Sequence, residues 1–296
     1  MDRLDAIAAF VTIADRGSFA AAAREHRVSP QAVTRAIAGL EARLGVQLLR
    51  RTTRSVRLTE EGALFLARAR QVLADLQDAE LMVMGARAEP RGTLVVTAPA
   101  LFGRLHVVPV AAELLRRHPR LTVRLLLLDR VVQLVEEGVD VAVRIGDLGD
   151  SAHHAVRLGE VRRILVASPA YLDAQGEPQT VSDLRRHQIV AFTGASGSDD
   201  WRFGPEEKQA VHVRPRLVVN GADAAIAAAE AGLGITRVLS YQAGGRIAEG
   251  RLRTVLDAAA PPALPVSLLF QANRGASPKV RAFIELARDQ LRNASW

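Results

Sequence analysis

The spacing of apolar residues divides this chain into three regions. In residues 1–59, apolar positions recur at intervals of three and four, which is the period of helices with one buried face. The same spacing continues through residues 60–89 as one long helix. In residues 90–296, short apolar runs alternate with helical stretches, as in α/β domains. The pattern predicts a helical head, a connecting helix and a larger α/β region.

Two capped helices are predicted in the head. Ser18 can cap the first, and Ser29 the second, whose first position holds Pro30, where the missing N–H costs nothing. Gly45 is expected to end the second helix in the left-handed conformation. One face of this helix forms a buried stripe of Val33, Ile37, Leu40 and Leu44. The pattern is that of a helix-turn-helix.

The opposite face of the second helix presents polar groups near its N-terminus, where a recognition helix meets base edges. Gln31 can donate to and accept from adenine, and Arg35 can reach guanine or a phosphate. Thr34 and the positive end of the helix suit a phosphate. The candidate DNA contacts on these helices are Ser18, Ser29, Pro30, Gln31, Ala32, Thr34 and Arg35.

A basic turn between two short strand-like pieces follows at residues 46–58, and this arrangement is typical of a wing. Its candidate contacts, along the DNA backbone or in the minor groove, are Arg50, Arg51, Thr52 and Arg54. The alternative is a solvated arginine-rich loop. The tandem of helix-turn-helix and wing favours DNA binding.

The net charge of the chain is concentrated in this head. Residues 16–57 hold nine arginines against two acids, a charge of +7 that equals the net charge of all 296 residues. The remainder is therefore neutral. A basic surface on a compact helical unit suits double-stranded DNA, because the duplex carries a dense negative charge.

The long helix begins after Thr59, which can cap it, and carries Glu60 and Glu61 at its positive end. Its apolar residues step by four and three over about three heptads, until Pro90 ends the pattern. Such a seam favours pairing with a second copy of the helix, and the alternative is packing on its own domain. The seam positions are Phe65, Ala69, Val72, Leu76, Ala79, Val83 and Ala86.

The remaining region is predicted to alternate strands and helices. The run at 121–127 is almost wholly apolar, as expected for a strand covered on both faces. Repeated βαβ order predicts a parallel sheet. The expected strands are 93–98, 121–127, 139–145, 164–167, 189–192, 217–219 and 266–270, and the expected helices are 105–118, 131–137, 223–231 and one beginning at 277.

Composition excludes several classes of protein. Cysteine is absent, which excludes disulfides and thiolate metal sites. No run of about 18 apolar residues occurs, so neither a transmembrane helix nor a membrane partner is expected. Residues 6–14 could be mistaken for a signal-peptide core, but acids flank them at Asp2, Asp5 and Asp15. We therefore expect a cytoplasmic protein.

The sequence offers no enzymatic centre. His153 and His154 are adjacent and point in different directions, which disfavours a shared metal ion. Residues 194–197 miss the spacing of a nucleophile elbow by one residue. Residues 232–234 lack the rest of a dinucleotide fingerprint and more simply end a helix. We expect no enzyme, no metal site and no cofactor.

Five segments carry a family resemblance: residues 17–23, 28–37, 40–45, 48–54 and 58–62. They resemble the LysR family of transcriptional regulators. The resemblance implies an N-terminal all-α winged helix-turn-helix, a long linker helix and a C-terminal effector-binding domain. Many family members have Gln-Pro where this chain has Pro30-Gln31, so the base contact of that earlier glutamine is not carried over directly.

The resemblance continues in residues 140–146 and 277–283. It implies two α/β lobes like those of periplasmic binding proteins, with a small molecule in the cleft between them. Lobe I would comprise about 90–160 and 266–296, and lobe II about 161–265. The resemblance further implies that linker helices pair into dimers, commonly two per tetramer, on an interrupted palindromic operator.

Ligands of open α/β sheets bind at the carboxyl ends of strands. That rule indicates residues 98–103, where backbone N–H groups at a helix start could hold an anion, although Pro99 lacks an N–H. The alternative for Asn220 is a helix cap, and for Arg144 a surface ion pair. The candidate effector contacts are Pro99, Ala100, Leu101, Phe102, Asp129, Arg144, Phe192, Thr193, Asn220 and Thr236.

Together these features predict a LysR-type regulator that binds specific double-stranded DNA under the control of a small-molecule effector. RNA polymerase is a further candidate partner. The alternative is an intracellular or periplasmic small-molecule-binding protein without regulatory output. Specific binding to promoter DNA separates the two predictions.

Overall fold

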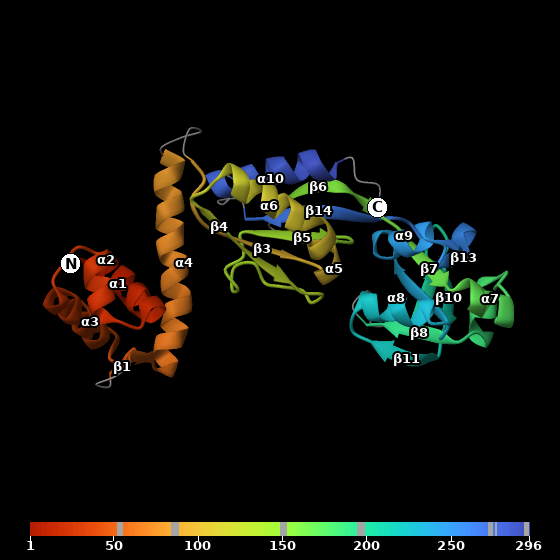
Figure 1. Ribbon diagram of the computed structural model, residues 1–296, viewed down its shortest axis with the longest axis horizontal. Coiled ribbons are helices and arrows are strands. Elements are labelled where there is room, and N and C mark those ends of the chain that lie inside the picture. Colours follow the sequence, from red (N-terminus) through yellow and green to blue (C-terminus); the bar gives the residue numbers. More distant parts are fainter. Residues whose placement is uncertain are drawn as a thin grey trace. The chain divides into compact units, whose positions relative to one another are not determined.

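The computed structural model describes residues 1–51, 56–83, 89–148, 153–193, 199–271, 275, 277–292 and 296. Its internal contacts divide the chain into two units, Met1–Ala88 and Glu89–Trp296. Each unit has its own buried core. The ribbon in Figure 1 shows the helices and strands that form each unit.

The first unit is a small helical domain with a two-stranded wing. Its recognition helix begins where the sequence predicts, because the Ser29 hydroxyl accepts the Ala32 N–H at 3.1 Å, and it ends at Gly45, which has φ of 70°. The elements are α1 (Arg3–Arg16), α2 (Phe19–Glu25), α3 (Pro30–Leu44), β1 (Leu49–Arg51), β2 (Val56–Leu58) and α4 (Glu60–Val83).

The predicted apolar stripe of α3 holds for three of its four positions. Val33, Ile37 and Leu40 are buried against α1, whereas Leu44 is 40% exposed. Leu44 lies in the last turn of the helix, directly before the Gly45 cap, beyond the end of the packed face. The prediction that Leu44 is buried was therefore wrong.

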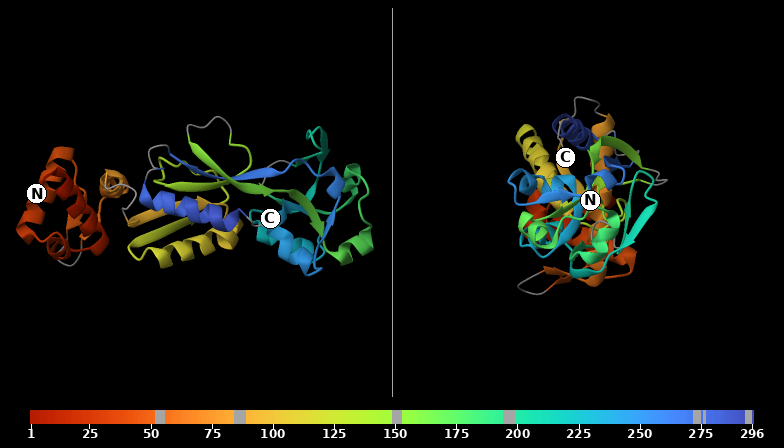
Figure 2. Two further views of the ribbon diagram at one scale, coloured as in Figure 1. Left: turned by 90° about the horizontal axis from the view of Figure 1, so that it is seen from above. Right: turned by 90° about the vertical axis from the view of Figure 1, so that its right-hand side faces the viewer.

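Lobe I of the second unit is a five-stranded sheet in the order β4-β3-β5-β14-β6. Figure 2 shows α6 and α10 side by side on one face of this sheet. The strands are β3 (Gly92–Ala98), β4 (Leu121–Leu127), β5 (Val141–Ile145), β6 (His154–Val161) and β14 (Leu264–Phe270). The helices are α5 (Ala100–Phe102), a π-helical turn (Gly103–Val107), α6 (Val108–Arg117) and α10 (Pro278–Leu291).

Three expectations for this lobe need correction. The sheet is mixed, because β14 returns antiparallel to β5 and β6. Strand β4 lies at the sheet edge, where Leu121 is buried but Thr122 and Arg124 are exposed, so it is not covered on both faces. Residues 131–137 form turns without a helix, and Val132 and Leu134 from this segment cover the second face of the sheet.

Lobe II is a second five-stranded sheet, in the order β11-β8-β12-β7-β13. A hairpin of β9 (Asp200–Phe203) and β10 (Gln209–His212), which the sequence pattern did not predict, packs on one face. The strands are β7 (Arg163–Ala167), β8 (Ile189–Phe192), β11 (Pro215–Val219), β12 (Ile235–Leu239) and β13 (Arg253–Val255). The helices are α7 (Pro169–Gln175), α8 (Ala222–Glu230), α9 (Ser240–Ala248) and short 3-10 turns at Val181–Arg186 and Asp257–Ala259.

Candidate nucleic-acid interface and ligand cavity

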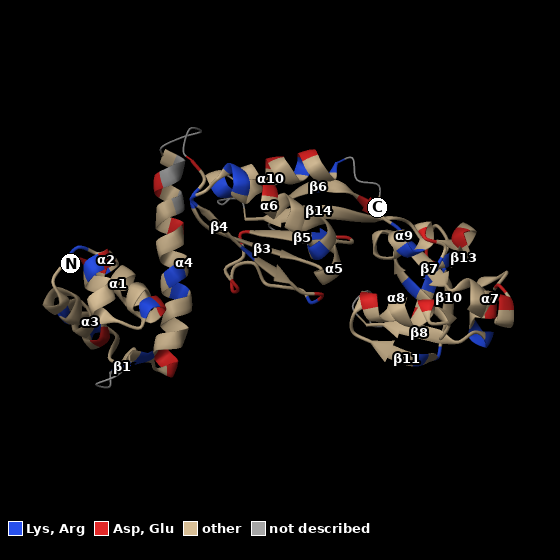
Figure 3. Ribbon diagram, in the orientation of Figure 1, with Lys and Arg blue, Asp and Glu red and all other residues tan. Residues whose placement is uncertain are grey.

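The polar face of α3 is free to meet another molecule. Gln31, Thr34 and Arg35 are exposed, and no hydrogen bond or ion pair joins their side chains to any other described residue. Pro30 is also exposed, and Ala32 is half-buried. Figure 3 shows basic residues spread over the head, from α2 to β1. A helix end with unsatisfied donors and exposed polar groups is suited to contacting phosphates and base edges.

The two serines among the candidate contacts have a structural task. Ser18 accepts the Ala21 N–H at 3.2 Å, and Ser29 accepts that of Ala32 at 3.1 Å. These bonds fix the start of α2 and α3. Each hydroxyl retains its own O–H, which can donate to a phosphate oxygen.

Glu41 fastens the wing to the recognition helix. Its Oε1 accepts the N–H groups of Leu48 at 2.8 Å and Leu49 at 3.1 Å. On the other side, the Thr59 hydroxyl donates to the Gln47 carbonyl at 2.7 Å and accepts the Gly62 N–H at 2.9 Å. The two bonds to the Glu41 carboxylate are charge-assisted and therefore stronger than neutral hydrogen bonds. The wing therefore leaves α3 in a defined direction.

The wing itself carries closely spaced arginines. Arg50 and Arg57 are both exposed and face each other across the hairpin. Like charges at such cross-strand positions repel, and a phosphate between them would relieve the repulsion. The side chain of Arg51, and Thr52 and Arg54 entirely, lie outside the described residues.

The seam of α4 divides into two parts. Phe65 packs on Phe10 with ring centroids 5.4 Å apart, and Ala69 is 1% exposed in the core of the head. These two positions pack on their own domain, which corrects their assignment to a partner helix. Further along, Val72, Leu76 and Val83 are 49%, 39% and 90% exposed, and Ala79 is exposed. Ala86 lies outside the described residues.

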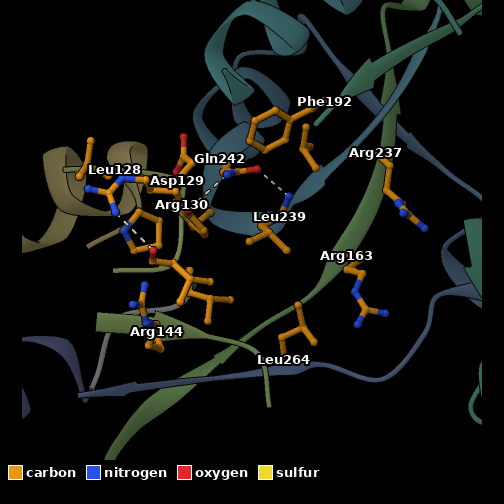
Figure 4. Close-up of a pocket in the computed structure, with 15 residues that line it drawn as sticks. Leu128, Asp129, Arg130, Arg144, Arg163, Phe192, Arg237, Leu239, Gln242 and Leu264 are labelled. Carbon is orange, nitrogen blue, oxygen red and sulfur yellow. Dashed lines mark hydrogen bonds between the residues drawn. The ribbon is translucent and has the colours of Figure 1, made fainter. Parts of the chain in front are cut away.

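A cavity of about 220 Å³ opens between residues of the two lobes in the second unit (Figure 4). Four of the ten candidate effector residues line it, namely Pro99, Asp129, Arg144 and Phe192. Further lining residues are Leu128, Arg130, Val131, Ile145, Arg163, Arg237, Val238, Leu239, Tyr241, Gln242 and Leu264. The remaining candidates, Ala100, Leu101, Phe102, Thr193, Asn220 and Thr236, are not among the lining residues.

The expected anion cradle at the start of α5 is already occupied. The Asp129 carboxylate accepts the Ala100 N–H at 3.0 Å. Pro99, the residue before it, has no N–H to offer. A carboxylate ligand at this helix start would therefore compete with Asp129, and the prediction of a backbone anion site at residues 98–103 needs correction.

The other displaced candidates have identifiable roles or positions. Phe102 is buried beneath Tyr241, with ring centroids 5.2 Å apart. Thr236 is completely buried in β12. Thr193 bonds to the Val219 carbonyl through its N–H at 3.0 Å and its hydroxyl at 3.3 Å. Asn220 is exposed and does not cap α8, whose N-cap is Gly221.

Four arginines line the cavity, and each makes different contacts with its neighbours. Arg130 donates two hydrogen bonds to Glu137, at 2.8 and 2.7 Å, whereas Arg144 donates to the Val132 carbonyl at 2.9 Å. The guanidinium of Arg237 lies 4.9 Å from the centre of the Trp201 ring. The fourth, Arg163, forms an ion pair with Glu207.

Burial weakens the basicity of two of these groups. Burial, together with the nearby Arg163 guanidinium, lowers the pKa of Arg237 to about 10, and Glu207 acts against that shift. Burial also lowers the pKa of Arg144, and Glu137 acts against that shift. Both groups remain cationic at neutral pH. Their surroundings stabilise the positive charge poorly, so a nearby anion would stabilise the charged form of both arginines.

Among the described residues no group of histidines and acids is placed to hold a metal ion. In the same part of the chain, no helix has the length and apolar character needed to cross a membrane. The described residues thus form a head with an exposed polar helix face and a second unit with a polar, arginine-lined cavity.

Comparison with known proteins decides the family. Residues 4–63 match the bacterial regulatory helix-turn-helix protein, lysR family, and residues 87–292 match the LysR substrate binding domain. The chain belongs to the LysR family of transcriptional regulators. As a LysR regulator, it combines a DNA-binding domain with an effector-binding domain.

Relatives of this LysR regulator match over nearly the whole chain. It is 35% identical to the HTH-type transcriptional regulator PtxR of Pseudomonas aeruginosa over 289 residues, which cover 97% of this chain and 93% of PtxR. It is 30% identical to CrgA of Neisseria meningitidis serogroup B, over 96% of this chain and 95% of CrgA. The solved structure of Neisseria meningitidis CrgA superposes with a TM-score of 0.64 at 29% identity, covering 97% and 98% of the two chains.

The sequence analysis did not identify several residues of the two candidate sites. Arg163, Arg237 and Gln242 line the cavity, and Glu41 fixes the wing. One signal was available in the sequence. Arg237 interrupts an otherwise buried strand, and an arginine amid apolar neighbours is often functional. The acid Glu41 inside a strongly basic segment was a second signal.

Proposed function

We propose that residues 1–59 bind operator DNA through the first turns of α3 and the wing. The contacts we assign to DNA are those predicted above, with Gln31 and Arg35 at base edges and Arg50 on a phosphate. To these we add Arg57, which pairs with Arg50 across the hairpin. The observation that carries this proposal is the row of exposed, unbonded polar side chains at Gln31, Thr34 and Arg35. A surface of this kind reads the major groove at little cost, because no internal bond has to be broken.

We propose further that residues 60–89 pair two chains and that residues 90–296 bind the effector in the arginine-lined cavity. Val72, Leu76, Ala79 and Val83 are the pairing positions, which is supported by their exposure on α4. A dimer reads two half-sites of an interrupted palindrome, and a tetramer is two such dimers. The effector shifts the regulator between states only through a difference in affinity for them.

This function places the protein in the cytoplasm, without catalytic activity, with DNA, the effector, its own copies and RNA polymerase as partners. The absence of catalysis is supported by the relatives, which are transcriptional regulators. Turnover of a bound effector by the purified protein would contradict it.

The DNA-binding proposal is tested with two arginine variants. Arg35→Ala should weaken specific binding by about tenfold or more and nonspecific binding much less, because a base contact is worth about 1–3 kcal/mol. Arg50→Ala should weaken both alike and flatten the salt dependence, because it removes a phosphate contact. Gel shifts with promoter DNA and with scrambled DNA measure both. Equal losses for the two variants, or no specific binding by the wild type, would contradict the assignment.

Pairing is tested by Leu76→Asp, which should abolish the dimer and tight operator binding, because a charge at the seam has to be desolvated. The matched control is Ala67→Asp, an exposed position about two and a half turns before Leu76 and therefore on the opposite face of the same helix. Sedimentation of both variants gives the answer. If Leu76→Asp sediments like the wild type, α4 does not pair the chains.

A further inference from the structure

The charges around the cavity do not balance. Four guanidinium groups line it, from Arg130, Arg144, Arg163 and Arg237, against one carboxylate, Asp129. Two acids that are not lining residues form ion pairs with these arginines: Glu137 with Arg130, and Glu207 with Arg163. Counting these acids, four positive charges face three negative ones. The lining groups and these two acids together therefore carry one excess positive charge, which suits a ligand with a single negative charge.

Arg144 is the guanidinium best placed to use that excess. It is half-buried, and its one hydrogen bond to a described residue goes to the neutral Val132 carbonyl. Among the described residues no carboxylate forms an ion pair with it. The nearby Glu137 has both carboxylate oxygens engaged by Arg130. A guanidinium carries five N–H donors, so Arg144 keeps donors available for a planar anion.

Apolar side chains form much of the rest of the wall, together with Tyr241 and Gln242. Figure 4 shows Phe192, Leu239 and Leu264 between Arg144 on one side and the pair Arg163 and Arg237 on the other. A cavity of about 150 Å³ lined by apolar side chains accommodates benzene. The volume of about 220 Å³ here leaves room for a ring or six-carbon chain together with one carboxylate. The ligand therefore has a small apolar body and one charged end.

We propose that the cavity binds a small organic monocarboxylate, whose charged end lies on Arg144 and whose apolar body packs on Phe192, Leu239 and Leu264. This inference rests on the proposed function only in taking the cavity as the effector site. It differs from the sequence expectation, which sought the anion at the start of α5. Asp129 occupies that position, so we assign the selection of an anionic ligand to Arg144 on β5.

The test is calorimetric titration of the full-length chain with matched acids and amides. The probes are cyclohexanecarboxylate with cyclohexanecarboxamide, and hexanoate with hexanamide, at millimolar concentration. We expect at least one acid to bind about tenfold or more tightly than its amide, because a guanidinium–carboxylate pair exceeds a neutral hydrogen bond. Failure of both acids to bind, or equal binding of acid and amide, would overturn the proposal.

Two arginine variants locate the charge selection. Arg144→Gln should abolish the preference for the acid, whereas Arg144→Lys keeps the charge and should retain part of it. The matched control is Arg130→Gln, which removes the same charge from the same cavity but from a guanidinium that Glu137 already holds. We expect this variant to lose less than about threefold, as for a partly screened neighbouring charge. Equal losses in Arg144→Gln and Arg130→Gln would show that only the overall charge matters and would refute the role of Arg144.

A third variant distinguishes two questions: whether the ligand binds in this cavity, and whether the cavity prefers an anion. Leu264→Trp fills the apolar part of the cavity and should reduce the binding of acids and amides together. If amides bind as well as acids and Leu264→Trp weakens both, the cavity is the effector site but does not select an anion. If Leu264→Trp changes neither, the ligand binds elsewhere, and the proposed effector site fails along with this inference. The DNA gel shift without ligand is unaffected by either result.

Discussion

On α3 of the head, the side chains of Gln31, Thr34 and Arg35 are exposed and bond to no other described residue. In the cavity of the second unit, by contrast, Arg130 is already held by Glu137, and Asp129 by a backbone N–H. These side chains of the head can therefore contact a partner without first breaking an internal bond. The cavity holds Arg130 and Asp129 in internal contacts, whereas Arg144 keeps donors available for a ligand. A ligand favours one conformation over another when it binds that conformation more tightly, for example because an internal contact has been replaced there.

The same contrast governs how polar groups contribute to stability. In the head, the polar contacts that shape the interface are local caps and the bonds from Glu41 and Thr59, at the surface or partly buried. In the second unit, a charged pair lies fully inside the core. The predictions below test that contrast, beginning with the largest expected effect.

The buried pair of Lys279 and Asp140 should be the most sensitive point of the second unit. Their side chains are 3% and 2% exposed, with Nζ 3.7 Å from Oδ2, and the ammonium also donates to the Thr93 carbonyl at 2.9 Å. Lys279→Met leaves the Asp140 charge buried without its cation, which costs about 3–5 kcal/mol. Both tryptophans, Trp201 and Trp296, lie in this unit, so denaturation followed by tryptophan fluorescence reports its unfolding alone.

The control for this change is Lys208→Met. Lys208 has 82% of its side chain exposed and pairs with Glu206 at the surface, so its loss should stay within about 0.5 kcal/mol. Hydrogen exchange in residues 1–88 should be unchanged in both variants if the two units keep separate cores. A loss below about 1 kcal/mol for Lys279→Met would break the proposed contrast, because the buried pair would then contribute no more than a surface pair.

Two glycines of the head should respond in opposite directions. A Cβ at Gly62 would lie 2.0 Å from the Leu48 carbonyl oxygen, which is backbone and is fixed by the wing, so Gly62→Ala should destabilise the head by about 1–3 kcal/mol. A Cβ at Gly39, within α3, would meet no atom within 4 Å, so Gly39→Ala should stabilise the head by up to about 1 kcal/mol. Hydrogen exchange of residues 1–88 in the full chain measures both. Changes of the same sign would mean that the wing yields to the added methyl group.

The contrast between the units also explains what could be predicted from the sequence. The limits of α3 follow from Ser29, Pro30 and Gly45, because capping depends on residues a few positions apart. The same holds for Thr59 at the start of α4. DNA-contacting residues are likewise close together in the chain. Local chemistry therefore indicates both the fold and the candidate site of the head.

The cavity could not be derived in this way. Its walls come from Pro99, Arg144, Arg163, Arg237 and Leu264, which meet only after both lobes have formed. The failure at residues 131–137 has the same origin. Apolar spacing there suggests a helix, but the Arg130–Glu137 pair and the bond from Arg144 to the Val132 carbonyl hold the segment as a turn. Tertiary contacts decided the conformation against the local preference.

The smallest expected effect concerns His106, beside the cavity wall. Its ring centroid lies 4.7 Å from that of Phe102, its Nε2 is buried without a hydrogen-bond partner among the described residues, and burial lowers its pKa. A histidine whose pKa is lower in the folded state favours unfolding once the unfolded chain takes up a proton. The stability of the second unit should therefore fall as the pH drops below about 6.5. His106→Phe removes this proton uptake and the unpaired nitrogen, so the melting temperature by tryptophan fluorescence should fall less between pH 7.5 and pH 5.5 than in the wild type. Parallel decreases in the two proteins would assign the pH dependence to groups other than His106.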